Sequence, residues 1–189
     1  MKTDTAVLSP IIYAVQSKLQ GAKTLVVAID GCCGSGKTYY SGLLAEYFGA
    51  TVISCDDFFL PVTMRSAERL GEVGGNIHYE RLWDVLSKVR QGKAFTYSAY
   101  VCSTDSFEKR KFEPARVVIV EGSYALHRQL DAFYDVKVLL TVDKQTQYDR
   151  LLKREGAEGV ANFTNKWIPL ENRYFATLDT TDCLIIKTD

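Results

Sequence analysis

The sequence predicts an α/β fold in which a mainly parallel sheet carries helices on both faces. Continuous apolar runs at residues 25–29 and 117–120 are typical of strands that are buried on both sides of such a sheet. These runs alternate along the chain with segments of helical spacing, which favours parallel strands joined by helices. With 189 residues, 47% of them hydrophobic, the chain can bury one sizeable core, so we expect a single domain over residues 1–189.

The first half of the chain contains two of the expected strands. An amphipathic helix over residues 7–19 precedes the strand at 25–29, and a helix over 39–48 leads to a short strand at 51–54. Residues 62–77 are polar and contain three glycines, so they predict a mobile loop. A helix is expected over residues 79–89, with four residues on its core face: Leu82, Trp83, Leu86 and Val89.

The second half is expected to complete the sheet. Residues 94–101 and 111–113 predict a small hairpin insertion, and strands are expected at 116–120 and 136–142. The C-terminal elements are then a helix over 144–154, a short flexible segment at 156–159, a helix over 165–178 that is broken near Pro169, and a last strand at 183–186.

Residues 31–38 match the phosphate-loop pattern G-x-x-x-x-G-K-[ST] at every fixed position. Glycines allow a tight loop whose N–H groups point at phosphate oxygens, and the start of the following helix adds its positive end. Lys37 is expected to reach the β and γ phosphates, and Thr38 to ligate Mg²⁺. The pattern therefore predicts a P-loop NTPase-type fold that binds ATP through eight residues: Gly31, Cys32, Cys33, Gly34, Ser35, Gly36, Lys37 and Thr38.

Carboxylates follow two other strands at the edge where ligands of parallel sheets gather. Asp56 and Asp57 follow the strand at 51–54, and one of them is expected to accept the proton of an acceptor hydroxyl. Glu121 ends the strand at 116–120, so Thr38, Asp56 and Glu121 are the expected Mg²⁺ ligands. The alternatives are a helix cap for the aspartates and a solvated strand end for Glu121.

Arg150 and Arg154 are four residues apart on one helix and therefore share a face. Because Gly156 and Gly159 follow, we expect a short lid over about residues 150–165 that brings both arginines to the transferring phosphoryl group. The alternative is a solvated helix face.

Composition excludes several classes of function. Lys and Arg together number 23, as do Asp and Glu, so the zero net charge gives no footprint for nucleic acid. Residues 1–5 begin no signal peptide, no apolar run approaches membrane-spanning length, and five cysteines form no disulfide or metal spacing. We therefore expect a cytoplasmic protein with neither a nucleic-acid nor a membrane partner; whether it forms a homo-oligomer is left open.

Three segments in order resemble the uridine kinase family, which belongs to a wider group with phosphoribulokinases and bacterial pantothenate kinases. They are residues 29–38, residues 56–61 and residues 121–126, and the likeness covers nearly the whole chain. By position, the resemblance implies that Asp56 is the catalytic base and Glu121 the metal-associated acid. It also implies that Asp57, Phe59, His78 and Tyr100 lie at the acceptor. His78 stands where that family carries a ribose-binding aspartate.

The resulting expectation is an ATP- and Mg²⁺-dependent kinase acting on a hydroxyl of a small metabolite. By resemblance the acceptor is a nucleoside such as uridine or cytidine; pantothenate, a sugar, or ATP hydrolysis without an acceptor are the alternatives. A GTPase switch is disfavoured because residues 165–168 lack the aspartate of a guanine reader. The identity of the acceptor, the choice between ATP and GTP, and the choice between Asp56 and Asp57 as the base are left open by the sequence.

Overall fold

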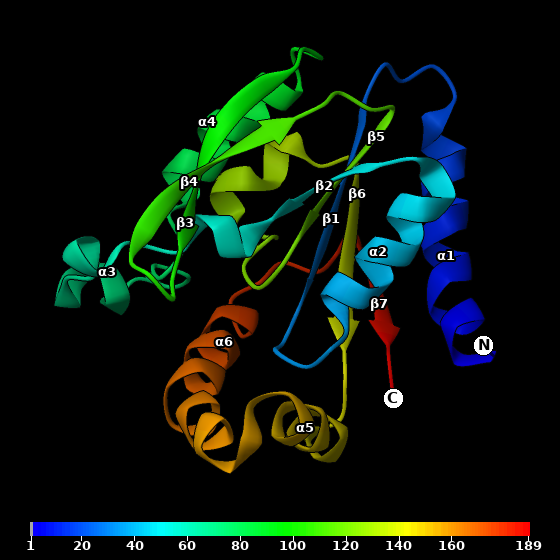
Figure 1. Cartoon of the computed structure of the whole chain (residues 1–189). Helices are drawn as coiled ribbons and strands as arrows, with labels where there is room; N and C mark the ends of the chain where they lie inside the picture. Colours follow the sequence, from blue (N-terminus) through cyan, green and yellow to red (C-terminus); the bar gives the residue numbers. More distant parts are fainter. Residues whose placement is uncertain (1) are drawn as a thin grey trace.

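Five parallel strands form the central sheet, in the order β2-β5-β1-β6-β7 (Figure 1). The strands are β1 (Leu25–Gly31), β2 (Thr51–Ser54), β5 (Val117–Glu121), β6 (Val136–Thr141) and β7 (Cys183–Lys187). The computed structural model describes residues 2–189, so Met1, the first residue of the expected domain, lies outside the described residues. The parallel order confirms the predicted α/β fold.

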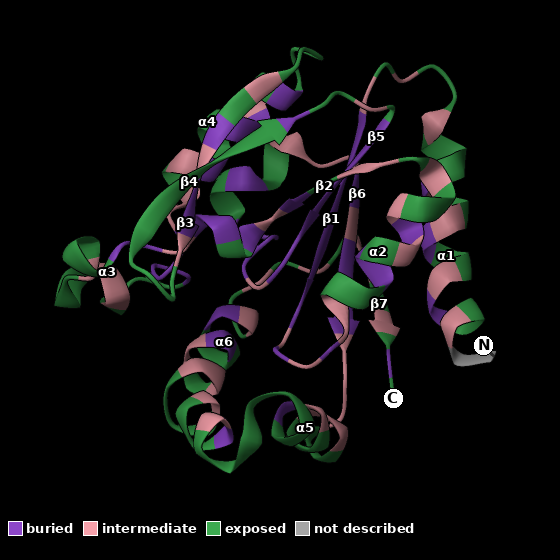
Figure 2. Cartoon of the chain, in the orientation of Figure 1, coloured by how far each residue is buried: buried purple, intermediate pink, exposed green. Residues whose placement is uncertain are grey.

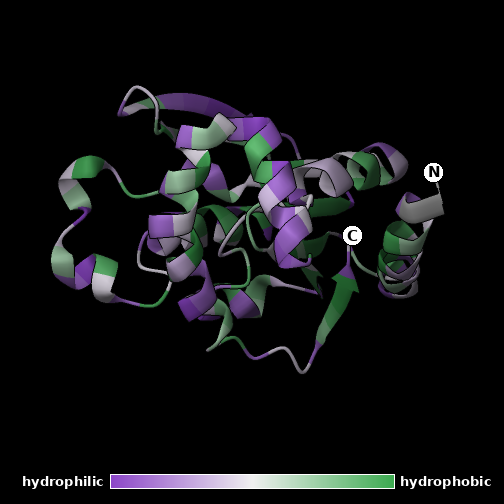
Figure 3. Cartoon of the chain, turned by 90° about the horizontal axis from the view of Figure 1, so that it is seen from below, coloured by the Kyte–Doolittle hydropathy of each residue, from purple (hydrophilic) through white to green (hydrophobic). Residues whose placement is uncertain are grey.

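Alternating residues of β1 point to opposite faces of the sheet, as the strand period of two requires. Leu25, Val27 and Ile29 pack on one face with α1 (Lys2–Leu19) and α2 (Lys37–Phe48). On the other face, Val26 packs with α4 (Tyr79–Val89). Figure 2 shows the buried strands between these helices, and Figure 3 shows the hydrophobic strands at the centre of the molecule.

A two-stranded antiparallel hairpin covers part of the second face and confirms the predicted insertion. It consists of β3 (Phe95–Val101) and β4 (Ser106–Phe112), paired from Phe95–Phe112 to Val101–Ser106. Its second strand begins five residues earlier than the sequence predicts. Residues 106–111 are all exposed, so they lack the apolar pattern that marks a strand in sequence.

Two details of the first half differ from expectation. Residues 62–77 include two short helices, η2 (Val62–Met64) and α3 (Ala67–Gly71), the second capped by the Ser66 side chain. In α4, Trp83 is 47% exposed and Val85 is buried in its place. Successive helical residues are rotated by about 100°, so residues 82, 85, 86 and 89 share one face and residue 83 lies at its edge.

The C-terminal half is more helical than predicted. Helix α5 (Lys144–Asn162) continues past Gly156, where the backbone kinks at φ 72° and ψ 178°. A π-helical turn (Phe163–Trp167) leads into α6 (Ile168–Phe175), and residues 176–178 lie beyond its end. Pro169 does not break this helix because it lies in the first turn, where its missing N–H would have no helical partner. Among the described residues, no helix has the length and apolar character needed to cross a bilayer.

Candidate active site

The predicted phosphate loop connects β1 to α2, and its glycines have conformations that other residues rarely adopt. Gly34 and Gly36 have φ of 79° and 89°. A Cβ atom on Gly31 would lie 2.3 Å from the Leu140 carbonyl oxygen of β6. The sequence therefore folds this way locally because glycine alone permits the tight turn and the close packing against the sheet.

Asp30 fixes the start of this loop from beneath. Its carboxylate is fully buried and accepts hydrogen bonds from the Gly31 N–H at 2.6 Å, the Leu126 N–H at 2.9 Å and the Tyr174 hydroxyl at 2.8 Å. Burial raises the pKa of Asp30 to about 6, although these three donors and the charge of Lys37 oppose the shift. Asp30 thus ties the loop to two distant segments of the chain.

The loop presents donors toward a cavity. Lys37 Nζ donates to the carbonyl oxygens of Gly31 at 2.8 Å and Cys32 at 3.0 Å, which keeps the ammonium group folded over the loop. In the part of the chain that the structure describes, the N–H groups of Gly34 and Gly36 donate to no protein acceptor. Together with the free N–H groups at the start of α2, these donors suit a polyphosphate chain.

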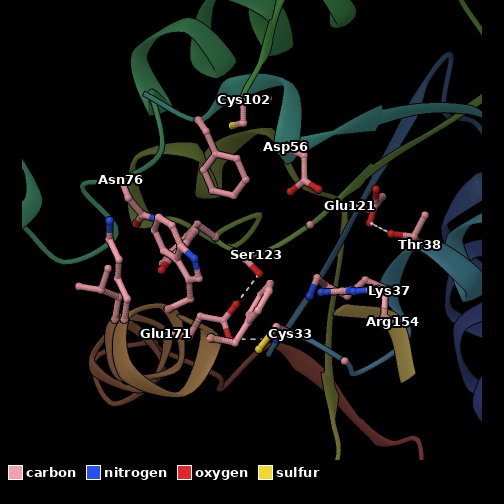
Figure 4. Close-up of a pocket in the computed structure, with 18 of the residues that line it drawn as sticks. Cys33, Lys37, Thr38, Asp56, Asn76, Cys102, Glu121, Ser123, Arg154 and Glu171 are labelled. Carbon is pink, nitrogen blue, oxygen red and sulfur yellow. Dashed lines mark hydrogen bonds between the residues drawn. The ribbon is translucent and has the colours of Figure 1, made fainter. Parts of the chain in front are cut away.

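The cavity has a volume of about 510 Å³ and lies at the carboxyl ends of the strands (Figure 4). Ten residues that the sequence singled out line it: Cys33, Gly34, Gly36, Lys37, Thr38, Asp56, Phe59, Glu121, Arg150 and Arg154. Gly31, Cys32 and Ser35 belong to the loop but do not line the cavity. The structure therefore brings the expected nucleotide, metal and base residues to one place.

Glu121 connects two elements at the cavity wall. Its carboxylate accepts hydrogen bonds from the Thr38 hydroxyl at 3.2 Å and the Ser54 hydroxyl at 3.0 Å. Burial raises the pKa of Glu121 and the nearby charge of Asp56 adds to the shift, while both hydroxyls and Lys37 lower it. Thr38, Asp56 and Glu121 form an all-oxygen set at this wall, and such ligands suit Mg²⁺.

No group of three or more His, Cys, Asp or Glu residues gathers for a metal within the described residues. Mg²⁺ is usually held by one or two carboxylates together with substrate phosphates and water, and Asp56 and Glu121 are two carboxylates in the lining of the cavity.

Asp56 and Asp57 are neighbours in sequence but face different surroundings. Asp56 lines the cavity, and burial raises its pKa, with opposing contributions from Lys37 and Arg154. Asp57 does not line the cavity: its carboxylate accepts a hydrogen bond from Tyr97 at 2.9 Å and pairs with Arg110 at 3.3 Å. Burial also raises the pKa of Asp57. Of the two, only Asp56 can contact a bound acceptor at this cavity.

Two other residues expected at the acceptor lie outside the cavity lining. The Tyr100 hydroxyl donates to Asp105 at 2.6 Å. His78 accepts the Arg81 N–H at the start of α4 and contacts Glu80 at 3.0 Å. Of the four expected acceptor contacts, only Phe59 lines the cavity. Position in the chain could not reveal this, because His78 serves as a helix cap and the Tyr100 hydroxyl faces the hairpin turn.

The two lid arginines have different partners. Arg150 donates to the Gly34 carbonyl oxygen at 3.0 Å and to the Thr188 carbonyl oxygen, so it links the phosphate loop to the C-terminal segment. Arg154 is more exposed, pairs with Glu155 at 2.6 Å and lies 5.4 Å from the ring centre of Phe163. Both line the cavity, yet only Arg154 is free of contacts to the loop.

Sequence reasoning missed a buried carboxylate in the cavity wall. Glu171 of α6 accepts the Cys33 N–H at 2.9 Å and the Ser123 hydroxyl at 2.7 Å, and it is only 4% exposed. Figure 4 shows Glu171 between these partners. No local pattern marks Glu171, because its two partners lie 138 and 48 positions away in the chain. The cavity is completed by several residues that no motif marks, among them Arg65, Asn76, Cys102, Lys166 and Trp167.

Comparisons with known proteins identify a matching family and similar folds. The model of the phosphoribulokinase / uridine kinase family matches residues 26–159. A uridine kinase of Staphylococcus haemolyticus is 28% identical over 171 residues, which cover 81% of this chain and 82% of that protein. Inorganic pyrophosphatase TTM2 of Arabidopsis thaliana is 28% identical over 127 residues, but the match spans only 18% of that longer protein.

Two solved structures share the fold over nearly their whole length. A candidate fructose transport system kinase from Silicibacter sp. TM1040 has a TM-score of 0.75 at 20% identity, with 95% of this chain and 98% of the other covered. A possible uridine kinase from Bacillus stearothermophilus has a TM-score of 0.67 at 18% identity, with 95% and 100% covered. At these identities the likeness establishes the fold alone.

Proposed function

Because the chain belongs to the phosphoribulokinase / uridine kinase family, we propose that it is an ATP- and Mg²⁺-dependent kinase for a small-molecule alcohol. One observation carries the proposal: Lys37, Asp56 and Glu121 line a single cavity. A phosphate-binding cation, a candidate base and a candidate metal ligand are the parts that phosphoryl transfer to a hydroxyl needs.

Each residue has a role that follows from its position. Lys37 and the N–H groups of the loop bind the β and γ phosphates of ATP. Thr38, Asp56 and Glu121 would hold Mg²⁺, which supplies charge neutralisation for the phosphates when it is bound.

Asp56 also accepts the proton of the attacking hydroxyl. Its raised pKa makes it a stronger base than an aspartate with the ordinary pKa. Arg154 stabilises the charge that develops on the transferring phosphoryl group.

A nucleoside such as uridine or cytidine is the first candidate acceptor, supported by the uridine kinase relative. A different small alcohol, such as pantothenate or a sugar, is the second candidate. The second is favoured by the placement of Asp57, His78 and Tyr100, whose side chains have protein partners and do not line the cavity. A cytoplasmic location and the absence of nucleic-acid and membrane partners stay predictions.

A coupled assay of ADP release tests the proposal. Wild-type protein with Mg²⁺ and ATP is screened against nucleosides, pantothenate, sugars and sugar acids, with GTP as an alternative donor. We expect at least one alcohol to raise the rate of ADP release well above the rate without acceptor. A rate that no alcohol changes would instead indicate ATP hydrolysis without acceptor chemistry.

A further inference from the structure

The cavity contains a guanidinium that the phosphate-transfer machinery does not use. Arg65 follows Asp56 and Phe59 in the chain, and its Nε donates to the Leu60 carbonyl oxygen at 2.9 Å. This bond fixes one edge of the group. Within residues 2–189, no carboxylate lies within 4.0 Å of the Arg65 side-chain nitrogens. Arg65 is thus a partly buried cation at a cavity wall without a counter-ion.

The surroundings of Arg65 place it at the far side of the cavity from the phosphate loop. Burial raises the pKa of the Cys102 thiol, and Arg65 is the charge that most opposes the shift, so the two side chains are close. In Figure 4, Cys102 and Asn76 lie across the cavity from Lys37 and Arg154. Asp56 lies between Cys102 and Lys37 in this view. If the phosphate loop binds ATP and Asp56 is the base, an acceptor hydroxyl would lie on this side of Asp56.

The one carboxylate of the neighbouring hairpin turn uses its Oδ1 atom for two hydrogen bonds and forms no ion pair with Arg65 among the described residues. Asp105 accepts the Tyr100 hydroxyl at 2.6 Å and the Val62 N–H at 3.4 Å. Lys166, an exposed residue that also lines the cavity, lies 4.7 Å from the ring centre of Trp167 and forms no ion pair among the described residues. Arg65 and Lys166 therefore line the same cavity as Asp56 without carboxylate partners in residues 2–189, and they are additional to Lys37 and Arg150, which contact the phosphate loop.

We propose that the phosphoryl acceptor is an anionic alcohol whose carboxylate or phosphate group binds Arg65. This inference rests on the proposed kinase function and names its substrate class. The Arg65 guanidinium is partly removed from water, so it should bind an anion more tightly than a neutral group. Two parallel hydrogen bonds to a carboxylate or phosphate group would replace the hydration that the guanidinium has lost. Phe59 and Trp167 would pack on the apolar part of the acceptor, and its hydroxyl would face Asp56.

The test uses matched alcohols that differ in charge. D-Pantothenate and D-glycerate are compared with panthenol and glycerol for the carboxylate, and D-ribose 5-phosphate is compared with D-ribose for the phosphate. Calorimetry measures their binding to the full chain saturated with Mg²⁺ and a non-hydrolysable ATP analogue. ADP release from ATP is measured in parallel for each alcohol.

We expect an anionic member to bind at least tenfold more tightly than its neutral partner. Arg65→Gln should weaken that binding by roughly tenfold to a hundredfold, the loss typical of a hydrogen bond between charged groups. Arg65→Lys should recover part of it. Arg128→Gln, a control at an exposed position outside this cavity, should leave it unchanged.

Equal binding of neutral and anionic partners, or no binding by any anionic member, would overturn the inference. So would an Arg65→Gln protein whose only defect is a higher KM for ATP, since Arg65 would then serve the nucleotide. ADP release with a neutral alcohol alone would support the kinase and overturn the anionic acceptor. Tight binding of an anionic alcohol without ADP release would support the acceptor class and contradict the kinase.

Discussion

Replacement of Glu171 by alanine tests whether α6 holds the phosphate loop in place. The carboxylate is 4% exposed and accepts two hydrogen bonds, from the Cys33 N–H and the Ser123 hydroxyl. Each bond to a charged group contributes about 1.5–3 kcal/mol, so Glu171→Ala should lower the free energy of unfolding by about 3 kcal/mol or more. That is a large share of the roughly 5–15 kcal/mol that stabilises a typical domain.

Glutamine at the same position is the matched control. Its oxygen can still accept the Cys33 N–H, and its amide can donate to the Ser123 hydroxyl, which is able to accept. Glu171→Gln should therefore cost only about 1 kcal/mol, the usual value for neutral hydrogen bonds. Urea denaturation measures the free energy of unfolding of both Glu171 variants. The same measurement on Ser123→Ala and on the double variant Glu171→Ala/Ser123→Ala gives the coupling energy of the Glu171–Ser123 pair.

Two results would contradict this role of Glu171. One is a Glu171→Ala protein within about 0.5 kcal/mol of the wild type, which is the range of ordinary surface substitutions. The other is a coupling energy of zero between Glu171 and Ser123. In the expected case the alanine variant should also show a higher KM for ATP, because the Cys33 N–H no longer has the acceptor that orients the loop.

Asp56→Asn should lower kcat by roughly 10²–10⁴-fold with ATP binding retained. Asp57→Asn should lower kcat less but lower the midpoint of urea unfolding more. Steady-state kinetics and urea titration distinguish the two variants. Arg154→Ala should lower kcat at an unchanged urea midpoint, while Arg150→Ala should also lower the midpoint, because its guanidinium holds carbonyls of the loop and of the C-terminal segment. The pKa of Asp30 is about 6 in the folded state and 3.8 in the unfolded chain, so the folded protein favours the protonated carboxyl group. The contribution of Asp30 to the free energy of unfolding is therefore complete below pH 3.8 and is lost as the pH rises through about 6. Urea titrations across that window should show a loss of about 3 kcal/mol that Asp30→Asn removes; an unchanged pH profile in the variant would exclude Asp30 as its source.

The fold could be predicted because its signals are local. The buried strands are continuous apolar runs, and the helices between them have regular spacing, so β1, α2 and β5 follow directly from neighbouring residues. The first part of β4, residues 106–110, and the short helix α3 were missed because neither has an apolar face to mark it. The helical continuation after Gly156 was missed because glycine is read as a breaker, although a single kink satisfies it.

The site was predictable only where sequence spacing fixes geometry. Residues 31–38 must form one loop, and Glu121 must end its strand beside that loop. The choice between Asp56 and Asp57 depends on a 3₁₀ turn, in which neighbours point about 120° apart. The contacts of Glu171 join residues 138 and 48 positions apart, and the placement of Arg65 at the cavity wall likewise depends on how distant segments pack. No local pattern encodes either.

The central claim is that this cavity transfers a phosphoryl group from ATP to a small-molecule hydroxyl. The most direct measurement follows labelled γ-phosphoryl from ATP into the acceptor that raises ADP release in the screen, for the wild type and for Lys37→Ala. We predict one labelled phosphate ester per ADP with the wild type and none with Lys37→Ala, although the variant remains folded by circular dichroism. Label found only in inorganic phosphate, or near-wild-type transfer by Lys37→Ala, would contradict the central claim.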